Sequence, residues 1–465
     1  MNRIKMTTML ALLAASLVFA ACGGGNNAAA PAGGNTPAGN ATADNSTACA
    51  GTDGGTDNGG NDGGFDTAAE RDAVVAKAWK YLEGMYDGDD KTMDENKVGI
   101  PGGWGRNSSN IPYTAMVLDA IIGTKVWDSK NPKIAESIDW LVSVQEPGGG
   151  YSYAPADVMP QAKGVRAVYI TSIVATLFAQ LNKMDGPWKG KLNDPIAKAR
   201  DYIKQSQVGN ADGPAPDYEK SKVGFGGWAY SKEEIDDAVH GKGKPASNMS
   251  TSSFAIDALH ACGVSEDDPL WADALTFLKR NQNAGEVQDE GFEAMYKGKP
   301  VKMAEKGDPN YGGSIYSEET SKAGATENED GTVTLASYGS MTYNLLRAYL
   351  FAGLKKDSVP VKLAWGWIQR NYTLERVPGY PDAADHNRGL YYYILSMSKT
   401  LDAMGVDMLE EPERGLKHDW KQDMVKRLKG LQNGNGSWVN DNEDWQEDSP
   451  VLCTCYALGA LRRAK

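Results

Sequence analysis

The sequence predicts an all-α protein in which six helical hairpins close into a ring, an α/α toroid with inner and outer helices. Three observations predict this fold. One helix–loop–helix pattern recurs six times between residues 67 and 465, the first helix of each copy is polar on one side, and the second is apolar nearly all round. Helices of the second kind must be buried, and a closed ring buries all six at its centre. An open helical solenoid, whose ends would need caps, is the alternative.

The outer helices have clear start and stop signals. Asn or Asp is a good N-cap, and a following Pro suits the first helical turn. The clearest starts are Asn131-Pro132, Asp194-Pro195 and Asp268-Pro269, and the residues near the ends are Gln145, Gln207, Gln282, Gln369 and Gln432, with Tyr86 in that place in the first copy.

A glycine-rich loop with an aromatic residue follows each outer helix and leads into an apolar inner helix. The inner helices are expected at Tyr113–Ile122, Ala167–Leu181, Ser250–Cys262, Tyr338–Phe351, Gly389–Met404 and Pro450–Arg462. Three connecting segments, 208–222, 238–249 and 284–330, are longer than a plain hairpin needs and are rich in charged residues and glycine. Long loops in compact domains are often functional, so we expect a lid or a partner surface there.

Composition excludes one large class of function. The chain has 465 residues, 41% of them hydrophobic, and a formal net charge of −13. Lys and Arg do not cluster beyond the extreme N-terminus, so the chain has no basic footprint for nucleic acid.

The N-terminus resembles a bacterial lipoprotein signal. Arg3 and Lys5 precede an apolar run over residues 9–21, which ends in small residues before Cys22. The resemblance implies a signal peptide over residues 1–21, lipidation of Cys22, and an exported protein anchored in the cell envelope through that lipid. A plain secretory signal with a chance cysteine is the alternative.

Residues 22–66 are expected to be a disordered tether between the lipidated Cys22 and the toroid of residues 67–465. After Cys22 the segment is almost entirely Gly, Ala, Asn, Thr, Asp and Pro, with no Lys or Arg and one aromatic residue, Phe65. Such a composition cannot bury enough apolar surface to fold. The spacing of the cysteines does not determine which of them pair. The five are Cys22, Cys49, Cys262, Cys453 and Cys455.

Two of the six copies carry a known repeat. Gln145, Gly149 and Tyr151, and again Gln432, Gly436 and Trp438, match the Q-x-x-x-G-x-[WY] pattern of squalene cyclases. The body is therefore similar to the prenyltransferase/squalene-cyclase toroid superfamily. The repeat residues are expected to do structural work: the Gln bonds the loop backbone, the Gly lets the chain turn, and the aromatic residue packs over them.

The resemblance implies that any chemistry lies where the inner helices start. Cyclases of this kind use the middle acid of an Asp-x-Asp-Asp motif, and the nearest match is Glu234-Ile235-Asp236-Asp237, after the loop Gly226–Tyr230. Asp236, with Asp237, is the candidate catalytic acid. A solvated acidic loop or turn is favoured instead, because residues 238–246 contain Gly and Pro breakers and no apolar helix.

Relatives that transfer prenyl groups hold zinc through Asp, Cys and His. The nearest candidates here are Cys453 and Cys455 at the sixth inner helix, with His386 and Asp385 at the start of the fifth. Residues two apart on a helix point away from one another, so small buried cysteines and a capping His–Asp pair are favoured. No cofactor is expected.

A central cavity is the remaining candidate site. The residues expected to line it are Tyr113, Arg166, Tyr169, Tyr338, Tyr343, His386, Arg388, Tyr391 and Cys455. Aromatic faces with a few polar groups suit an isoprenoid-like lipid or a carbohydrate, although aromatics at helical spacing are often plain core.

Two functional hypotheses follow. In the first, a lipid-anchored envelope protein binds a ligand or partner without cyclase or prenyltransferase chemistry. In the alternative, the protein is a divergent terpenoid-cyclase-like or glycan-acting enzyme that uses the central cavity. An Asp or Glu pointing into the cavity from an inner-helix start would favour the enzyme.

Overall fold

The computed structural model describes residues 64–86, 103–105, 110–126, 130–155, 159–242 and 247–465. The chain divides into two units, Met1–Phe65 and Asp66–Lys465, and the description below concerns the second. The expected signal peptide, Cys22, Cys49 and nearly all of the expected tether lie outside the described residues.

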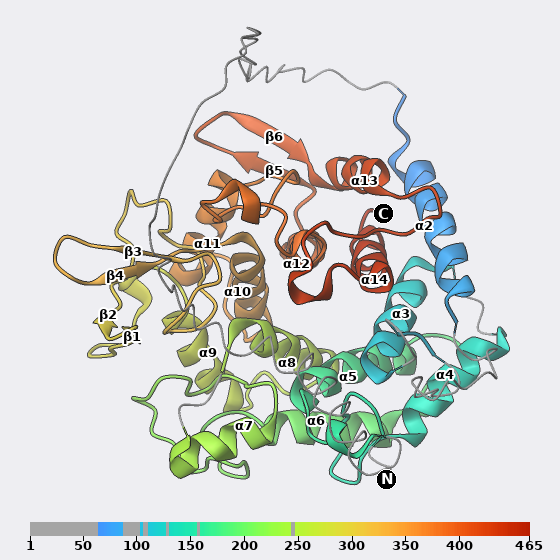
Figure 1. Cartoon of the computed structure of the whole chain (residues 1–465), viewed down its shortest axis with the longest axis horizontal. Helices are drawn as coiled ribbons and strands as arrows, with labels where there is room; N and C mark the ends of the chain where they lie inside the picture. The colour runs from blue at the N-terminus through green and yellow to red at the C-terminus, as the bar shows by residue number, and fades with distance from the viewer. Residues whose placement is uncertain (1–63, 87–102, 106–109, 127–129, 156–158, 243–246) are drawn as a thin grey trace, which may run out of the picture. The chain divides into compact units, whose positions relative to one another are not determined.

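Six hairpins account for all the longer helices described in the second unit (Figure 1). The outer helices are α2 (Thr67–Gly84), α4 (Pro132–Ser143), α6 (Asn193–Gln205), α9 (Leu270–Arg280), α11 (Val359–Arg370) and α13 (Trp420–Leu431). The inner helices are α3 (Ile111–Thr124), α5 (Ala167–Lys183), α8 (Met249–Ala261), α10 (Gly339–Phe351), α12 (Leu390–Met404) and α14 (Pro450–Leu461). The inner helices begin and end within a few residues of the expected positions.

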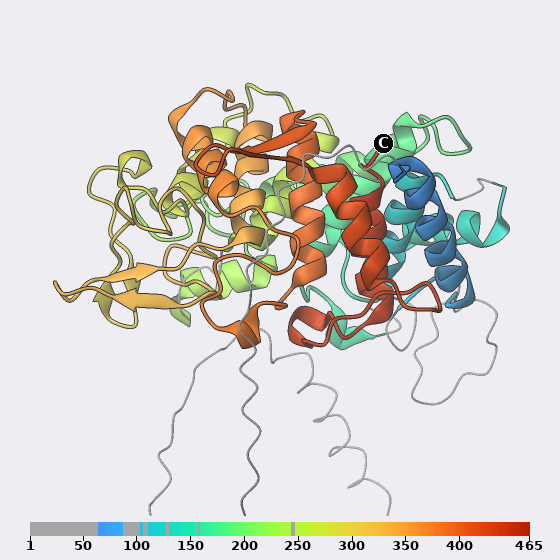
Figure 2. The ribbon, with the colours of Figure 1, turned by 90° about the horizontal axis from the view of Figure 1, so that it is seen from above.

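The inner helices form a closed ring. In chain order, α3 packs on α5, α5 on α8, α8 on α10, α10 on α12, α12 on α14, and α14 again on α3. Figure 2 shows the ring from the side, with the orange and red helices of the C-terminal part of the chain standing roughly parallel to one another. In α14 every residue from Val451 to Leu461 is buried, as expected of a helix surrounded by protein. The predicted α/α toroid is therefore confirmed, and the open solenoid is excluded.

The repeated glutamines join neighbouring hairpins. The Gln145 amide donates to the carbonyl of Gly149 in its own loop (3.0 Å) and to that of Pro195 in α6, the next outer helix (2.9 Å). Gln207, Gln282 and Gln432 make the same two kinds of bond. In the first copy the Tyr86 hydroxyl takes this place and donates to Lys133 of α4. The expected structural role of the glutamine is correct, and it extends to the following hairpin.

The glycine of the repeat lets the next outer helix approach. Gly226 has a φ of +80°, and a Cβ added there would lie 1.9 Å from the carbonyl oxygen of Asp273 in α9. Gly149, Gly312 and Gly436 combine a positive φ with the same kind of close contact. Any side chain at these positions would push two hairpins apart.

Loop tryptophans bind their loops to the preceding outer helix through the indole N–H. The indole N–H of Trp228 donates to the carbonyl of Ile203 (2.8 Å), and that of Trp438 donates to Leu428 (2.8 Å). Both carbonyls belong to the apolar residue four positions before the repeat glutamine, and Trp104 likewise donates to Leu82. These tryptophans are fully buried, so they hold the loops rigidly.

The seam between the sixth and first hairpins uses the same contacts as the other junctions. Gln432 of the last copy donates to Val74 in α2 (3.0 Å), and a Cβ on Gly436 would meet the Lys77 carbonyl. Arg462 adds an ion pair with Asp119 of α3 (3.0 Å). The ring is therefore closed by the repeat itself.

The connections between the ring helices carry small elements that the sequence did not predict. They include the short helix α7 (Lys232–Asp237), which runs into a π-turn at Ala238–Lys242, and three antiparallel two-stranded ribbons. The ribbons pair β1 (Met295–Tyr296) with β2 (Lys299–Pro300), β3 (Ala325–Glu327) with β4 (Val333–Leu335), and β5 (Met408–Glu411) with β6 (Leu416–Asp419). Among the described residues, no helix is both long and apolar enough to span a membrane.

Candidate functional site at the mouth of the ring

All six inner helices start at one end of the ring, which we call the mouth. Four starts are capped by a backbone carbonyl of the following hairpin's loop. The bonds run from Ile111 to Tyr153 (3.3 Å), from Val168 to Tyr230 (3.0 Å), from Met249 to Tyr316 (2.8 Å) and from Gly339 to Pro378 (2.8 Å). Each loop is thereby held against the start of the preceding inner helix, which fixes Tyr230 and Tyr316 at the mouth.

The fifth inner helix is capped by a carboxylate instead. Glu447 accepts from the backbone N–H groups of Tyr391 (3.2 Å) and Tyr392 (2.8 Å) at the start of α12, and from the Asn440 amide (2.6 Å). Burial raises the pKa of Glu447 to about 7, although these donors favour the ionised form. Because both oxygens are occupied by structural donors, Glu447 serves the fold.

Four aromatic side chains from different inner helices meet at the centre of the ring. The ring centroids of Tyr169 (α5) and Phe254 (α8) are 4.6 Å apart, those of Phe254 and Tyr392 (α12) 6.4 Å, and those of Tyr392 and Tyr456 (α14) 5.8 Å. Tyr169, Phe254 and Tyr392 are only partly buried. The centre is therefore an aromatic floor below the mouth.

Two tyrosines and two cations lie at the rim above this floor. The hydroxyls of Tyr230 and Tyr316 are 2.8 Å apart, so one donates to the other. The Arg166 guanidinium lies 5.5 Å from the centre of the Tyr230 ring, and the Lys322 ammonium lies 4.7 Å from that of Tyr316. Tyr230 also lies 6.1 Å from Tyr169 of the floor, which makes rim and floor one continuous surface.

Glu234 brings a carboxyl group to this rim. Its Oε2 accepts from the Tyr230 backbone N–H (3.2 Å), and the side chain is half-buried. Burial raises the pKa of Glu234, and the Tyr230 N–H and the Arg166 charge oppose that rise. A carboxyl group with a raised pKa can hold a proton at higher pH than an exposed one.

The two acids singled out from the cyclase pattern lie elsewhere. Asp236 and Asp237 are exposed on α7, and the Asp236 carboxylate lies 3.3 Å from His240. The segment is a short helix, not the loop or turn that we expected, because Ser231 caps it by accepting from the Glu234 N–H (3.2 Å). Neither acid has the dry surroundings that protonation of an alkene requires.

A strained segment crosses the mouth on the other side. Trp445 and Gln446 both have a positive φ, of 54° and 68°, which is costly for residues other than glycine. Gln446 accepts from the Tyr113 hydroxyl (3.2 Å), and Trp445 is 40% exposed with the Arg388 guanidinium 5.0 Å from its ring. Arg388 is also paired with Asp444 (2.6 Å). The backbone strain thus presents an exposed indole at the rim.

A polar network continues beneath the aromatic floor. Asn344 donates to the Tyr392 hydroxyl (2.8 Å) and accepts from Arg347 (3.0 Å), which is paired with Asp257 (2.8 Å). Lys399 is bound to the other Asp257 oxygen. Burial would raise the pKa of Asp257, but the two cations outweigh it and hold that pKa at about 2, whereas burial lowers the pKa of Lys399 to about 8.

Part of the expected cavity lining is at the mouth and part is not. Tyr113, Arg166, Tyr169 and Arg388 are there, and Tyr338 begins α10 beside them, 5.5 Å from Tyr380. The other four point elsewhere: Tyr343 packs on Tyr393 (5.7 Å), Tyr391 donates to Val439 (3.4 Å), His386 lies 3.4 Å from Arg376, and Cys455 is buried in α14. Adjacent helical residues differ by about 100° in direction, which moves these side chains off the centre.

The residues proposed for zinc do not fit that metal. The Cys453 thiol donates to the Glu447 carbonyl (2.9 Å), and burial raises the pKa of both Cys453 and Cys455, which favours thiols over the thiolates that zinc needs. The described residues contain no group of three or more His, Cys, Asp or Glu side chains placed to hold a metal ion. Cys262, Cys453 and Cys455 are free cysteines.

Sequence reasoning missed Tyr230, Phe254, Tyr316, Tyr392 and Tyr456, although one signal was available. A hydroxyl residue in the first turn of most inner helices accepts from a backbone N–H of its own loop: Thr114, Thr171, Ser252, Thr342 and Thr454. These hydroxyls mark the side of the helix that faces the loop, and residues two positions away lie nearly opposite. Tyr169, Phe254 and Tyr456 stand at that spacing.

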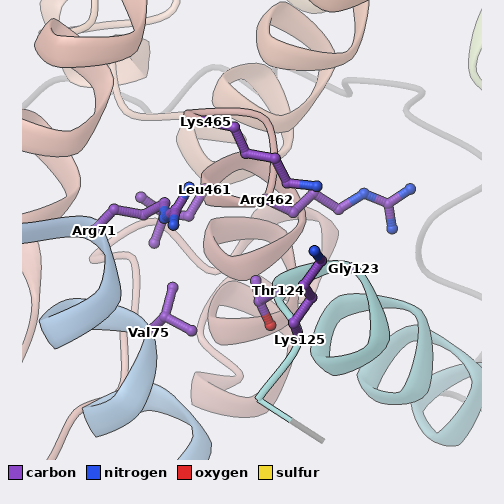
Figure 3. Close-up of a pocket in the computed structure, with 8 residues that line it drawn as sticks. All are labelled: Arg71, Val75, Gly123, Thr124, Lys125, Leu461, Arg462 and Lys465. Atoms are coloured by element: carbon purple, nitrogen blue, oxygen red, sulfur yellow. The ribbon is translucent and has the colours of Figure 1, made fainter. Parts of the chain in front are cut away.

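Two pockets lie away from the mouth. One of about 110 Å³ lies at the seam, between Arg71 and Val75 of α2, the end of α3 and the C-terminal residues Leu461, Arg462 and Lys465 (Figure 3). The other, of about 520 Å³, is formed where the three long connections meet, and it is lined by Pro216, Asp217, Tyr218, Ser221, Lys222, Val223, Ala238, Val239 and Glu293. The long connections therefore form a pocket that is separate from the mouth.

No protein-family model and no curated protein matches the chain. Among solved structures, the GH76A α-1,6-mannanase of Salegentibacter is 11% identical, with a TM-score of 0.45 over 85% of this chain and 98% of that one. An inactive variant of that mannanase in complex with α-1,6-mannotriose gives a TM-score of 0.46 over the same shares at 11% identity. A type II terpene cyclase from Scytonema, in complex with geranylgeranyl dihydroxybenzoate, is also 11% identical, with a TM-score of 0.45 over 86% of this chain and 98% of that one. Similarity at this level says nothing about activity.

Proposed function

We propose that this protein acts on a glycan, which it binds at the mouth of the ring. The observation that carries the proposal is the alternation of partly buried aromatic rings with hydrogen-bonding groups, contributed by several hairpins. A sugar ring has an apolar face and a rim of hydroxyls, so it needs both an aromatic platform and polar partners beside it.

The polar groups around the aromatic floor favour a sugar over an isoprenoid. At the rim, the Tyr230–Tyr316 hydroxyl pair keeps one proton to donate, and Arg166 and Lys322 have no ion pair among the described residues. An apolar ligand would strip water from these groups without replacing its hydrogen bonds, at a cost of about 1–3 kcal/mol for each group left unpaired.

Binding is tested by titrating the full chain with neutral and anionic oligosaccharides in a calorimeter. We expect at least one class to bind, and we expect Trp445→Ala to weaken that binding about tenfold or more, because the indole is a ready platform at the rim. Val439→Ala, which also removes an exposed apolar side chain, is the control. The proposal fails if no oligosaccharide binds the wild-type chain.

A second candidate function, cleavage of the bound glycan, is favoured by Glu234. Its partly buried carboxyl group lies beside Tyr230 at the rim, and burial raises its pKa, as a general acid requires. We expect Glu234→Gln to lower turnover by at least a hundredfold while leaving affinity within a fewfold, whereas the exposed Asp236→Asn should change neither. Equal effects of the two substitutions would count against Glu234 as the acid.

We also propose that the protein is exported and anchored to a membrane of the cell envelope through lipidated Cys22. This rests on the sequence of residues 1–22 alone. Metabolic labelling with a fatty acid should mark the wild-type chain and leave Cys22→Ala unlabelled. Release of the labelled chain by a high-salt wash would contradict a covalent anchor.

A further inference from the structure

Arg166 and Lys322 are two partly buried cations at the mouth that have no ion pair within the described part of the chain. Each lies over an aromatic ring instead: Arg166 is 5.5 Å from the centre of the Tyr230 ring, and Lys322 is 4.7 Å from that of Tyr316. The other cations of the ring centre and rim do have carboxylate partners: Arg347 has Asp257, and Arg388 has Asp444.

The surroundings make the position of Lys322 costly. Burial lowers the pKa of Lys322, and the charge of Arg388 lowers it further, with Asp444 opposing them. The chain as a whole carries a formal net charge of −13, so it has more carboxylates than cations to pair with them. Two partly desolvated cations that form no ion pair with any described residue indicate a site whose negative charge arrives with a ligand.

The backbone also fixes Arg166 in an unusual way. Arg166 is the N-cap of α5 and has φ 52° and ψ 27°, the left-handed region, which is costly for a residue with a side chain. The adjoining loop is tight, because a Cβ on Gly164 would lie 2.7 Å from the Glu233 carboxylate. The surrounding fold therefore holds the Arg166 backbone in this strained conformation, which sets where its side chain begins.

The tyrosine pair between the two cations adds a donor. The Tyr230 and Tyr316 hydroxyls are 2.8 Å apart, so one donates to the other and one proton is left to donate elsewhere. Burial raises the pKa of both tyrosines, so they stay protonated. Guanidinium, ammonium and phenol groups together offer donors to an oxyanion with little competition from acceptors.

We propose that the ligand at the mouth is an anionic sugar, whose carboxylate or sulfate group binds between Arg166 and Lys322 against the Tyr230–Tyr316 hydroxyl pair. This rests on the proposed glycan function and narrows it to one substrate class. Glu234, a carboxyl group on this rim, bonds to the Tyr230 N–H and forms no ion pair with Arg166 among the described residues. The sugar rings then lie over the aromatic floor.

The test compares matched probes on the full chain by calorimetry. Trigalacturonate is set against its methyl ester, and a sulfated galactan tetrasaccharide against its desulfated form. If trigalacturonate binds and its methyl ester does not, the bound group is a carboxylate. If the sulfated tetrasaccharide binds and its desulfated form does not, the bound group is a sulfate. Either result supports the proposal. In both cases affinity should fall with added salt, since an ion contact is screened.

Variants locate the contact. We expect Arg166→Gln and Lys322→Gln each to weaken binding of the anionic probe at least tenfold, and Arg166→Lys to recover part of the loss. Lys297→Gln is the control, because Lys297 also lies over a tyrosine ring, that of Tyr296 (5.0 Å), in the β1–β2 ribbon. Thermal unfolding of each variant checks that the ring is intact.

The outcomes separate the two proposals. If the esterified or desulfated probes bind as tightly as the charged ones, the anionic site is wrong and glycan binding stands. If charged probes bind but neither Arg166→Gln nor Lys322→Gln matters, the anionic site is also wrong. If none of these probes binds, the anionic site is wrong, and the titration with the wider set of neutral and anionic oligosaccharides decides whether glycan binding falls as well.

Discussion

Two fully buried carboxyl groups, Glu318 and Glu447, have very different partners. Glu447 accepts from two N–H groups at the start of α12 and from the Asn440 amide, whereas Glu318 accepts the Gly224 N–H (3.2 Å) through one oxygen. The other Glu318 oxygen is buried and makes no hydrogen bond within the described part of the chain. The two acids should therefore respond differently to conversion into an amide.

Glu318→Gln should raise stability at neutral and alkaline pH. Burial raises the pKa of Glu318 to about 7, above the usual 4.5, so the folded chain binds more protons than the unfolded chain between these values. The contribution of Glu318 to stability is therefore greatest below about pH 4.5 and falls as pH rises toward 7. Removing the charge should recover up to about 3 kcal/mol at pH 8 and flatten part of that fall.

Urea unfolding from pH 5 to pH 8 measures the effect. Glu413→Gln, at an exposed position, is the control and should leave the profile unchanged. Glu447→Gln should instead destabilise, because an amide N–H₂ would face the N–H donors of α12. A Glu318→Gln profile that runs parallel to the wild type would show that this carboxyl group is not the titrating one.

At the scale of the element, apolar runs between good caps located the inner helices. The expected Ala167–Leu181 and Ser250–Cys262 correspond to α5, Ala167–Lys183, and α8, Met249–Ala261. The β5–β6 ribbon and α7 were not predicted, because their few residues have no long period and their form depends on local pairing and capping.

The site was predicted only in part, for a geometric reason. Tyr391, Tyr392 and Tyr393 are consecutive in α12, and each step along a helix turns the side chain by about 100°. Of the three, only Tyr392 belongs to the aromatic floor. The Tyr391 hydroxyl donates to the Val439 carbonyl and the Tyr393 hydroxyl to the Thr373 carbonyl. Because inner helices are apolar nearly all round, composition does not reveal which side faces the centre.

The hairpin junctions predict a contrast between two glycines of similar conformation. Gly226 (φ +80°) and Gly263 (φ +75°) would both be strained by a side chain, but a Cβ at Gly263 meets nothing within 4 Å. We expect Gly263→Ala to cost about 1 kcal/mol. Gly226→Ala should cost at least twice as much, since Asp273 and α9 must also move. Equal losses in thermal or urea unfolding would refute close packing of the junction.

At the scale of the whole molecule, a closed ring should treat its seam like any other junction. Gln432 and Gln207 each donate one hydrogen bond to their own loop and one to the next hairpin. We expect Gln432→Ala and Gln207→Ala each to lower the free energy of unfolding by about 1–3 kcal/mol in a single transition. A Gln432→Ala chain as stable as the wild type would mean that the seam opens in solution.

The seam has a consequence for chain connectivity. Arg71 of α2 donates to the Ala464 carbonyl (2.8 Å), so the start of the first hairpin adjoins the end of the last. A short peptide joining residues 465 and 66 would make the polypeptide circular, and it could then be cut between any two hairpins. Such circular permutants should fold to the same barrel of helices, because no hairpin is structurally the first.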